Sequence, residues 1–237
     1  MRAPLRLGLP VALLLSVGGS PRRASPLESG AGVEAHALPD SAVAASAAGS
    51  LRPPPRPARR AESGEVLFSE DFRSLAAWRA DRDGVWSVAD GVLCAHLPDE
   101  KQERSLLYAG SEDWQDYAVD LDVRQLRGVD KGVAVRIHGG RGIGVDLRGG
   151  EYQDVLVYRQ SMALGRAPAP NADRVWHHLR VEARGNRYRI LVDGRQVLDC
   201  RDPMEADRRG RFALVAYTGG QGECSVQYAH VVVTKLE

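Results

Sequence analysis

The residues of this chain best suited to chemistry lie two apart, in stretches where polar and apolar side chains alternate. In one stretch Val133, Val135 and Ile137 alternate with Arg136 and His138. A period of two is typical of a β-strand with one buried face, so the polar pair is predicted to point outward. Histidine transfers protons near neutral pH, and a guanidinium group attracts developing negative charge. The stretch therefore predicts a strand face that can carry acid–base chemistry.

Neighbouring stretches repeat this alternation and are predicted to extend the same polar face. Besides Arg136 and His138, its expected members are Asp120, Asp122, Arg124, Asp146, Arg148, His178, Arg180 and Glu182. The aromatic rings available to it are Trp114, Tyr152, Tyr158 and Trp176. Sugars suit such a surface, because arginine and aspartate make paired hydrogen bonds to hydroxyl groups and rings stack on a pyranose. The alternative is a solvated face with ordinary cross-strand ion pairs.

The segment Trp176 to Asp199 shows most clearly which elements position these residues. It predicts three strands joined by tight turns at Gly185-Asn186 and Asp193-Gly194, whose residues tolerate positive φ. About a dozen similar strands and no amphipathic helix are expected from Glu65 onward. The predicted fold class is therefore all-β, an antiparallel sandwich or barrel of two sheets.

The first quarter of the chain differs in composition. Two arginines and an apolar run fill residues 1–20, which are predicted to be a secretory signal peptide, since the run is too short to span a bilayer. A wrongly assigned start or an uncleaved segment near a membrane is the alternative. Residues 21–64 are rich in Ala, Pro, Ser and Arg and are predicted to be a disordered linker. Residues 65–237 form the expected β domain, exported to the periplasm or the extracellular space.

Charge and cysteine content limit the partners. The chain has 32 basic and 31 acidic residues, of which eight basic and four acidic residues lie in residues 1–64. Residues 65–237 therefore have 24 basic and 27 acidic residues and a formal charge of about −3. This argues against nucleic acid, which is bound by basic surfaces. In an exported chain Cys200 and Cys224 could form a disulfide and leave Cys94 free, or all three thiols could be unpaired.

A family resemblance emerges from motifs that occur in a fixed order. They are FSEDFRSLAAW (Phe68 to Trp78), GVWSVADGVL (Gly84 to Leu93), DYAVDLDVR (Asp116 to Arg124), KGVAVR (Lys131 to Arg136), VYR (Val157 to Arg159) and WHHLRVEARGNR (Trp176 to Arg187). Over residues 66–235 this order resembles the 3-keto-disaccharide hydrolase family, a glycoside-hydrolase-like group of concanavalin A-like and laminin G-like folds. The resemblance implies a jelly-roll sandwich whose partner is an oligo- or polysaccharide.

The same resemblance implies a reaction and its residues. A 3-keto sugar can be cleaved by elimination, because the ketone acidifies the neighbouring C–H bond. Asp146, His138 and Arg136 would then be catalytic, as base and as the cation that stabilises an enolate. The substrate would be bound by Asp120, Asp122, Arg148, Tyr158, Trp176, His178 and Arg180.

The sequence departs from the family at one acidic position. Where the family commonly reads G-Y-E-V-Q-I, this chain reads GIGVDL, with Gly144 at the glutamate position and Asp146 at the glutamine position. This difference favours the alternative of a non-catalytic carbohydrate-binding or adhesion module. A domain that binds another protein through the same face is a third possibility.

No cofactor is expected from the sequence. His177 and His178 point to opposite faces of a strand and so cannot share one metal ion. Weak calcium binding at Asp81 to Gly84 or at Asp193-Gly194 is conceivable, but ordinary turn chemistry explains both segments better.

Overall fold

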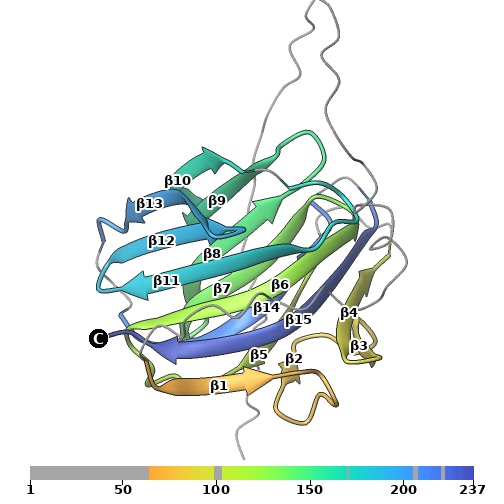
Figure 1. The fold of residues 1–237 in the computed structure, drawn as a ribbon, viewed down its shortest axis with the longest axis horizontal. Coiled ribbons are helices and arrows are strands. Elements are labelled where there is room, and N and C mark those ends of the chain that lie inside the picture. The colour runs from red at the N-terminus through yellow and green to blue at the C-terminus, as the bar shows by residue number, and fades with distance from the viewer. Residues whose placement is uncertain (1–63, 99–102, 170, 205–207, 220–221) are drawn as a thin grey trace, which may run out of the picture.

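The computed structural model describes residues 64–98, 103–169, 171–204, 208–219 and 222–237. These residues form two antiparallel sheets and no helix (Figure 1), so the expected all-β sandwich is confirmed. None of the described segments is a helix that could cross a membrane. The expected signal peptide and nearly all of the expected linker lie outside the described residues.

Sheet A carries the long central strands β6 and β15. Its strands, in spatial order, are β13 (Arg195–Arg201), β12 (Arg187–Val192), β11 (His177–Arg184), β6 (Tyr117–Arg127), β15 (Cys224–Lys235), β4 (Val92–Leu97) and β3 (Trp86–Ala89), and β1 (Val66–Glu70) also pairs with β15.

Sheet B lies behind sheet A in the view of Figure 1. Its strands, in spatial order, are β10 (Met162–Pro168), β9 (Asp154–Arg159), β8 (Arg141–Arg148), β7 (Asp130–His138), β14 (Arg211–Tyr217), β5 (Arg104–Ala109) and β2 (Arg79–Ala80). Consecutive strands switch sheets several times, as in a jelly roll.

The predicted three-stranded meander is confirmed as β11, β12 and β13. Asp193 and Gly194 both have positive φ, 49° and 81°, which is the backbone geometry of a two-residue hairpin turn. Asp90 and Gly91 repeat this geometry between β3 and β4, with φ of 53° and 74°. The turn residues thus set the register of both hairpins.

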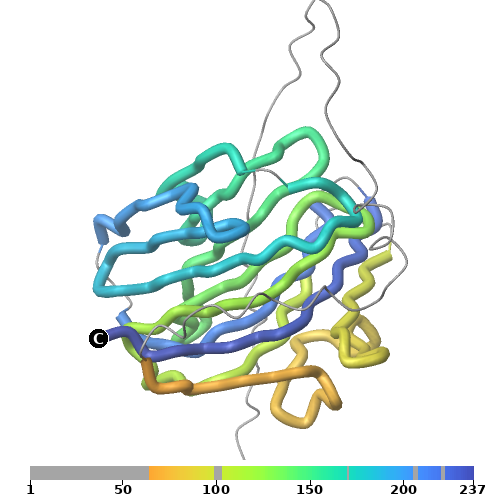
Figure 2. Tube along the Cα trace, in the orientation of Figure 1, coloured from red at the N-terminus to blue at the C-terminus, as the bar shows by residue number. Residues whose placement is uncertain are grey.

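The core lies between the sheets and consists of the apolar alternate residues of both. Two fully buried tyrosines of sheet A reach across it to the backbone of β7. The hydroxyl of Tyr228 accepts a hydrogen bond of 3.0 Å from the Gly132 amide, and that of Tyr117 accepts one of 2.7 Å from the Arg136 amide. These hydroxyls satisfy backbone groups where β7 is irregular, since both Gly132 and Arg136 have positive φ. The trace in Figure 2 shows β6 and β15, which bring the tyrosines, running side by side through sheet A.

A β-bulge in β7 overturns the predicted orientation of Arg136. Val135 pairs with Ile143 and His138 with Arg141, so Arg136 and Ile137 together oppose Gly142. The extra residue reverses the alternation, and Ile137 turns to the outer face while Arg136 turns into the interior. There its guanidinium is fully buried, bonds to Asp116 at 2.8 Å and to the Gly185 carbonyl, and lies over the Tyr188 ring. Arg136 therefore joins the two sheets and does not face solvent.

The three cysteines, all within described segments, are free thiols. The disulfide between Cys200 and Cys224 is therefore not formed, and the alternative of three unpaired thiols holds. Burial raises the pKa of Cys224 to about 12 and that of Cys200 to about 11, which makes both thiols poor nucleophiles.

Candidate functional site

The outer face of sheet B contains an open groove of about 200 Å³. Small side chains form its floor, because β7 contributes Ala134 and β8 contributes Gly142 and Gly144. Tyr108 of β5 stands on one side of this floor and Tyr158 of β9 on the other. The alternation of five neighbouring strands thus places two rings on opposite sides of a floor of small residues, an arrangement suited to a ring-shaped ligand.

Gly144 determines how the Tyr158 ring lies. A Cβ atom at position 144 would come within 2.3 Å of Cζ of Tyr158, so any larger residue would displace the ring. The ring takes the space above the strand, and its hydroxyl lies 3.4 Å from Oδ1 of Asp146. Where the resembling family has a glutamate, this chain therefore has a tyrosine ring paired with the aspartate two residues further on.

Asp146 is a buried carboxyl group whose surroundings favour its protonated form. Burial raises its pKa well above the ordinary value, and the nearby Asp130 raises it further. Burial, together with the charge of Asp146, likewise keeps the pKa of Tyr158 well above the usual range. The Tyr158 hydroxyl is therefore protonated at neutral pH and donates its hydrogen bond to Asp146.

A second carboxyl group, that of Asp130, lies on the same outer face. It opposes Arg148 in the register, whereas Asp146 opposes Gly132, which makes the two aspartates diagonal neighbours roughly 7–8 Å apart. Burial raises the pKa of Asp130 to about 6, against the lowering effect of Arg148 and Lys131. Its Oδ1 atom is buried and has no hydrogen-bond partner. Asp130 is thus poised to gain or lose a proton near neutral pH.

The positive charge at the groove comes from Arg104 of β5 and Arg141 of β8. The guanidinium of Arg104 acts electrostatically on Asp146 and Tyr158 and partly offsets the rise that burial causes in the pKa of each. Arg148 lies on the same sheet, but its Nε and Nη2 donate hydrogen bonds of 2.7 and 2.8 Å to Asp154, and its guanidinium covers Tyr152. The predicted contact residue Arg148 is therefore already engaged within the protein.

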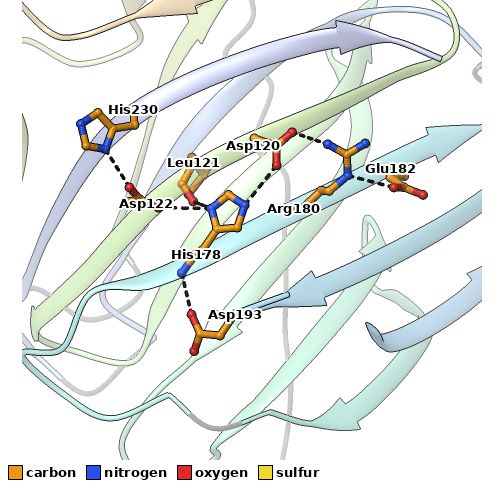
Figure 3. A network of polar contacts seen from close by, with 8 residues as sticks. All are labelled: Asp120, Leu121, Asp122, His178, Arg180, Glu182, Asp193 and His230. Carbon is orange, nitrogen blue, oxygen red and sulfur yellow. Dashed lines mark hydrogen bonds and ion pairs between the residues drawn. The ribbon is translucent and has the colours of Figure 1, made fainter. Parts of the chain in front are cut away.

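Four other predicted contact residues lie on the opposite side of the molecule, on the outer face of sheet A (Figure 3). His178 of β11 stands between two aspartates of β6, with Nε2 3.1 Å from Asp120 and Nδ1 3.1 Å from Asp122. Arg180 bonds to Asp120 and, at 2.8 Å, to Glu182. The polar groups drawn in Figure 3 contact one another, which is the pattern of a cross-strand ion-pair network.

The prediction of one continuous polar face is therefore wrong. Asp146, Arg148 and Tyr158 belong to sheet B, whereas Asp120, Asp122, His178 and Arg180 belong to sheet A. The strands that carry them alternate correctly, but alternation does not tell which sheet a strand joins.

Trp176 and His138 are not among the residues that line the groove. Arg124 of sheet A covers the Trp176 ring at 4.7 Å from its centre. His138 ends β7, where its Nδ1 lies 3.3 Å from the Glu112 carboxylate. The role of Trp176 in substrate binding and that of His138 in catalysis remain predictions.

In the segments considered for calcium, Asp81 and Asp193 make hydrogen bonds to other groups of the protein. Asp193 bonds to the His177 ring at 2.8 Å and to the His178 amide at 2.9 Å, and Oδ1 of Asp81 accepts bonds from Ser105 and from the Leu106 amide. Within the described segments, no group of three or more His, Cys, Asp or Glu residues is arranged to hold a metal ion. Calcium binding stays a prediction.

Sequence reasoning missed two groove residues, Arg104 and Tyr108, and the acid Asp130 beside Asp146. The alternation of β5 was hidden by the adjacent Leu106 and Leu107, of which only Leu107 is in the core. Asp130 precedes the buried Lys131 and looks like a turn residue in sequence. Its significance depends on its neighbours Arg148 and Asp146, which no local pattern reveals.

The described strands form a jelly-roll sandwich with an open groove on the outer face of sheet B. Residues 64–234 match the 3-keto-alpha-glucoside-1,2-lyase-like domain, so the chain belongs to that family and the resemblance found in the motifs is confirmed.

Solved structures agree with this fold. A carbohydrate-binding module, CBM66 from Bacillus subtilis, is similar with a TM-score of 0.56 and 17% identity over 67% of this chain and 96% of that one. A β-1,3-1,4-glucanase (lichenase) from a mouse hindgut metagenome is similar with a TM-score of 0.57 and 14% identity over 71% and 99%. A comparison with curated proteins gave no match.

Proposed function

We propose that the groove of sheet B binds a saccharide and cleaves a glycosidic bond next to a keto group by elimination. The observation that carries the proposal is the hydrogen-bonded pair of Tyr158, which lines a groove with a floor of small residues, and the buried Asp146. A tyrosine hydroxyl backed by a buried carboxyl group with a raised pKa is suited to stabilising an enolate. Family membership and the sugar-binding and sugar-cleaving names of the similar structures support a saccharide as the ligand.

The proposed step begins at the C–H bond between the ketone and the anomeric carbon. Asp130, which titrates near neutral pH, takes up this proton as its carboxylate. Tyr158, whose hydroxyl donates to Asp146 in the free protein, turns this hydrogen bond to the ketone oxygen as it becomes negative. The anomeric C–O bond then breaks, a carbon–carbon double bond remains in the sugar ring, and the departing oxygen takes a proton from water.

The test uses purified full-length chain with a 3-keto disaccharide and its non-oxidised parent as substrates. Cleavage of the keto sugar alone, followed by the absorbance of the conjugated product, is the expected result. Tyr158→Phe is expected to slow turnover roughly 100-fold, the usual effect of losing one donor to a developing oxyanion, with little change in binding. Arg187→Gln, on the outer face of sheet A, is the matched control. Unchanged turnover in Tyr158→Phe would contradict the proposed role.

A second function, saccharide binding without cleavage, is favoured by one observation. The position where the resembling family carries a carboxylate is Gly144, and the Tyr158 ring fills its space. Retention of the chain on a polysaccharide, with no release of product from keto or ordinary glycosides, would support this function. The two functions use the same groove and differ only in turnover.

The composition of residues 1–64 supports the further proposal that the domain acts after export. The apolar run and the arginines before it fit a secretory signal peptide, and the Pro-rich segment fits a tether. N-terminal sequencing of the mature protein from its host is expected to begin near residue 21. A mature protein that starts at Met1 in the cytoplasm would contradict export.

A further inference from the structure

The groove has an excess of positive charge. Its lining includes the guanidinium groups of Arg104 and Arg141 and a single carboxylate, that of Asp81. Asp81 is tied to β5, since its Oδ1 accepts hydrogen bonds of 2.7 Å from the Ser105 hydroxyl and 2.9 Å from the Leu106 amide. Burial raises the pKa of the nearby Asp146 well above its ordinary value. The groove therefore presents more cation than anion to a ligand.

Arg104 is the member of this set that points to a ligand. It is half-buried on β5, and within the described residues its guanidinium makes no ion pair and no hydrogen bond. Other arginines of similar or greater burial are paired: Arg148 with Asp154, Arg159 with Asp202 and Arg180 with Asp120. A partly desolvated guanidinium without a counter-charge is unfavourable, and an anionic ligand group would relieve this cost.

The position of Arg104 restricts where that anion would lie. Arg104, Leu106 and Tyr108 alternate along the outer face of β5, and Arg104 opposes Tyr217 of β14 in the register. Its charge acts on Tyr108 and on Tyr158, the rings on the two sides of the floor, and opposes the rise that burial causes in the pKa of both. A sugar ring lying between these two tyrosines would therefore have its edge toward Arg104.

We propose that the groove selects saccharides that carry a carboxylate, as uronic acids do, and that Arg104 binds this group. The planar fork of a guanidinium matches the two oxygens of a carboxylate. This inference rests on the proposed function only in that the groove must bind a saccharide, and it holds for either a cleaving or a non-cleaving domain.

The test measures binding of matched oligosaccharides that differ only in a glucuronate or a glucose unit, by calorimetry on the full-length chain. The glucuronate ligand is expected to bind at least about tenfold more tightly, the usual contribution of a charged hydrogen-bonded pair. Arg104→Gln is expected to remove this preference and leave the affinity for the neutral ligand within about twofold. Arg187→Gln, an exposed arginine of sheet A paired with Asp199, should keep the preference.

Two results would overturn the inference without touching the proposed function. One is equal binding of the neutral and acidic ligands by the wild-type chain. The other is an equal loss of both affinities in Arg104→Gln, which would indicate a structural role for Arg104. Absence of binding to both ligands, and to a wider set of neutral glycans, would contradict the proposed function as well.

Discussion

The contact between Gly144 and Tyr158 gives the sharpest test of the groove geometry. Replacing Gly144 by alanine places a methyl group 2.3 Å from Cζ of the Tyr158 ring, about 1.5 Å closer than the 3.5–4.0 Å of an optimal carbon–carbon contact. The φ of Gly144 is not positive, so the strand backbone itself accepts alanine. The whole effect must therefore come from moving the ring. Overpacking of this kind costs about 1–3 kcal/mol.

A double-mutant cycle isolates this effect. In urea unfolding, Gly144→Ala is expected to lower the free energy of unfolding by about 1–3 kcal/mol in the wild-type chain. In a Tyr158→Ala background the same change should cost close to nothing, because the obstructing ring is gone. A Tyr152→Ala background serves as the control, since Tyr152 makes no contact with position 144, and there the cost should persist. An equal cost in all three backgrounds would refute the placement of the ring over Gly144.

Three further predictions concern single residues. The pKa of Asp130 is about 6 in the folded chain, against 3.8 for an ordinary aspartate, as in the unfolded chain. The folded state therefore binds this proton more tightly, and the free energy of unfolding should fall as pH rises from about 4 to 6. Asp130→Asn should remove this dependence and gain on the order of 3 kcal/mol at pH 7, measured by denaturation at each pH. Arg136→Met should lower stability by about 1–3 kcal/mol, since it leaves the Gly185 carbonyl and the partly exposed Asp116 carboxylate without the guanidinium, while saccharide binding by the folded fraction persists. His178→Gln should lower stability and leave saccharide affinity unchanged in a titration. A clear loss of affinity would instead support a saccharide site on the outer face of sheet A, as the sequence suggests.

Much of the fold is predictable from local pattern. Asp-Gly turns fix the hairpins β3–β4 and β12–β13, because few residue types adopt two successive positive φ angles. The alternation of Leu179, Val181 and Ala183 identifies the buried face of β11 correctly. These features depend only on residues close in sequence, so the chain alone is sufficient to read them.

The site is less predictable, and β7 shows why. Strict alternation places Arg136 outside and Ile137 inside, yet the bulge reverses both, and the Tyr117 hydroxyl from the other sheet satisfies the Arg136 amide there. A bulge leaves almost no trace in a single sequence, since its cost is repaid by contacts with distant residues.

By itself the sequence determined the class of the domain, its strands and turns, the family to which it belongs and the importance of Asp146 and Tyr158 as candidates. Only the tertiary structure decided that His178 and Asp120 lie on one sheet and Asp146 on the other, that Arg136 is interior, and that Arg104 and Asp130 lie close to Asp146. The physical reason is that alternation fixes which side of a strand is polar, whereas the partner of each strand is chosen by long-range pairing across the whole chain. A site built from five strands is therefore a property of the assembled sheet.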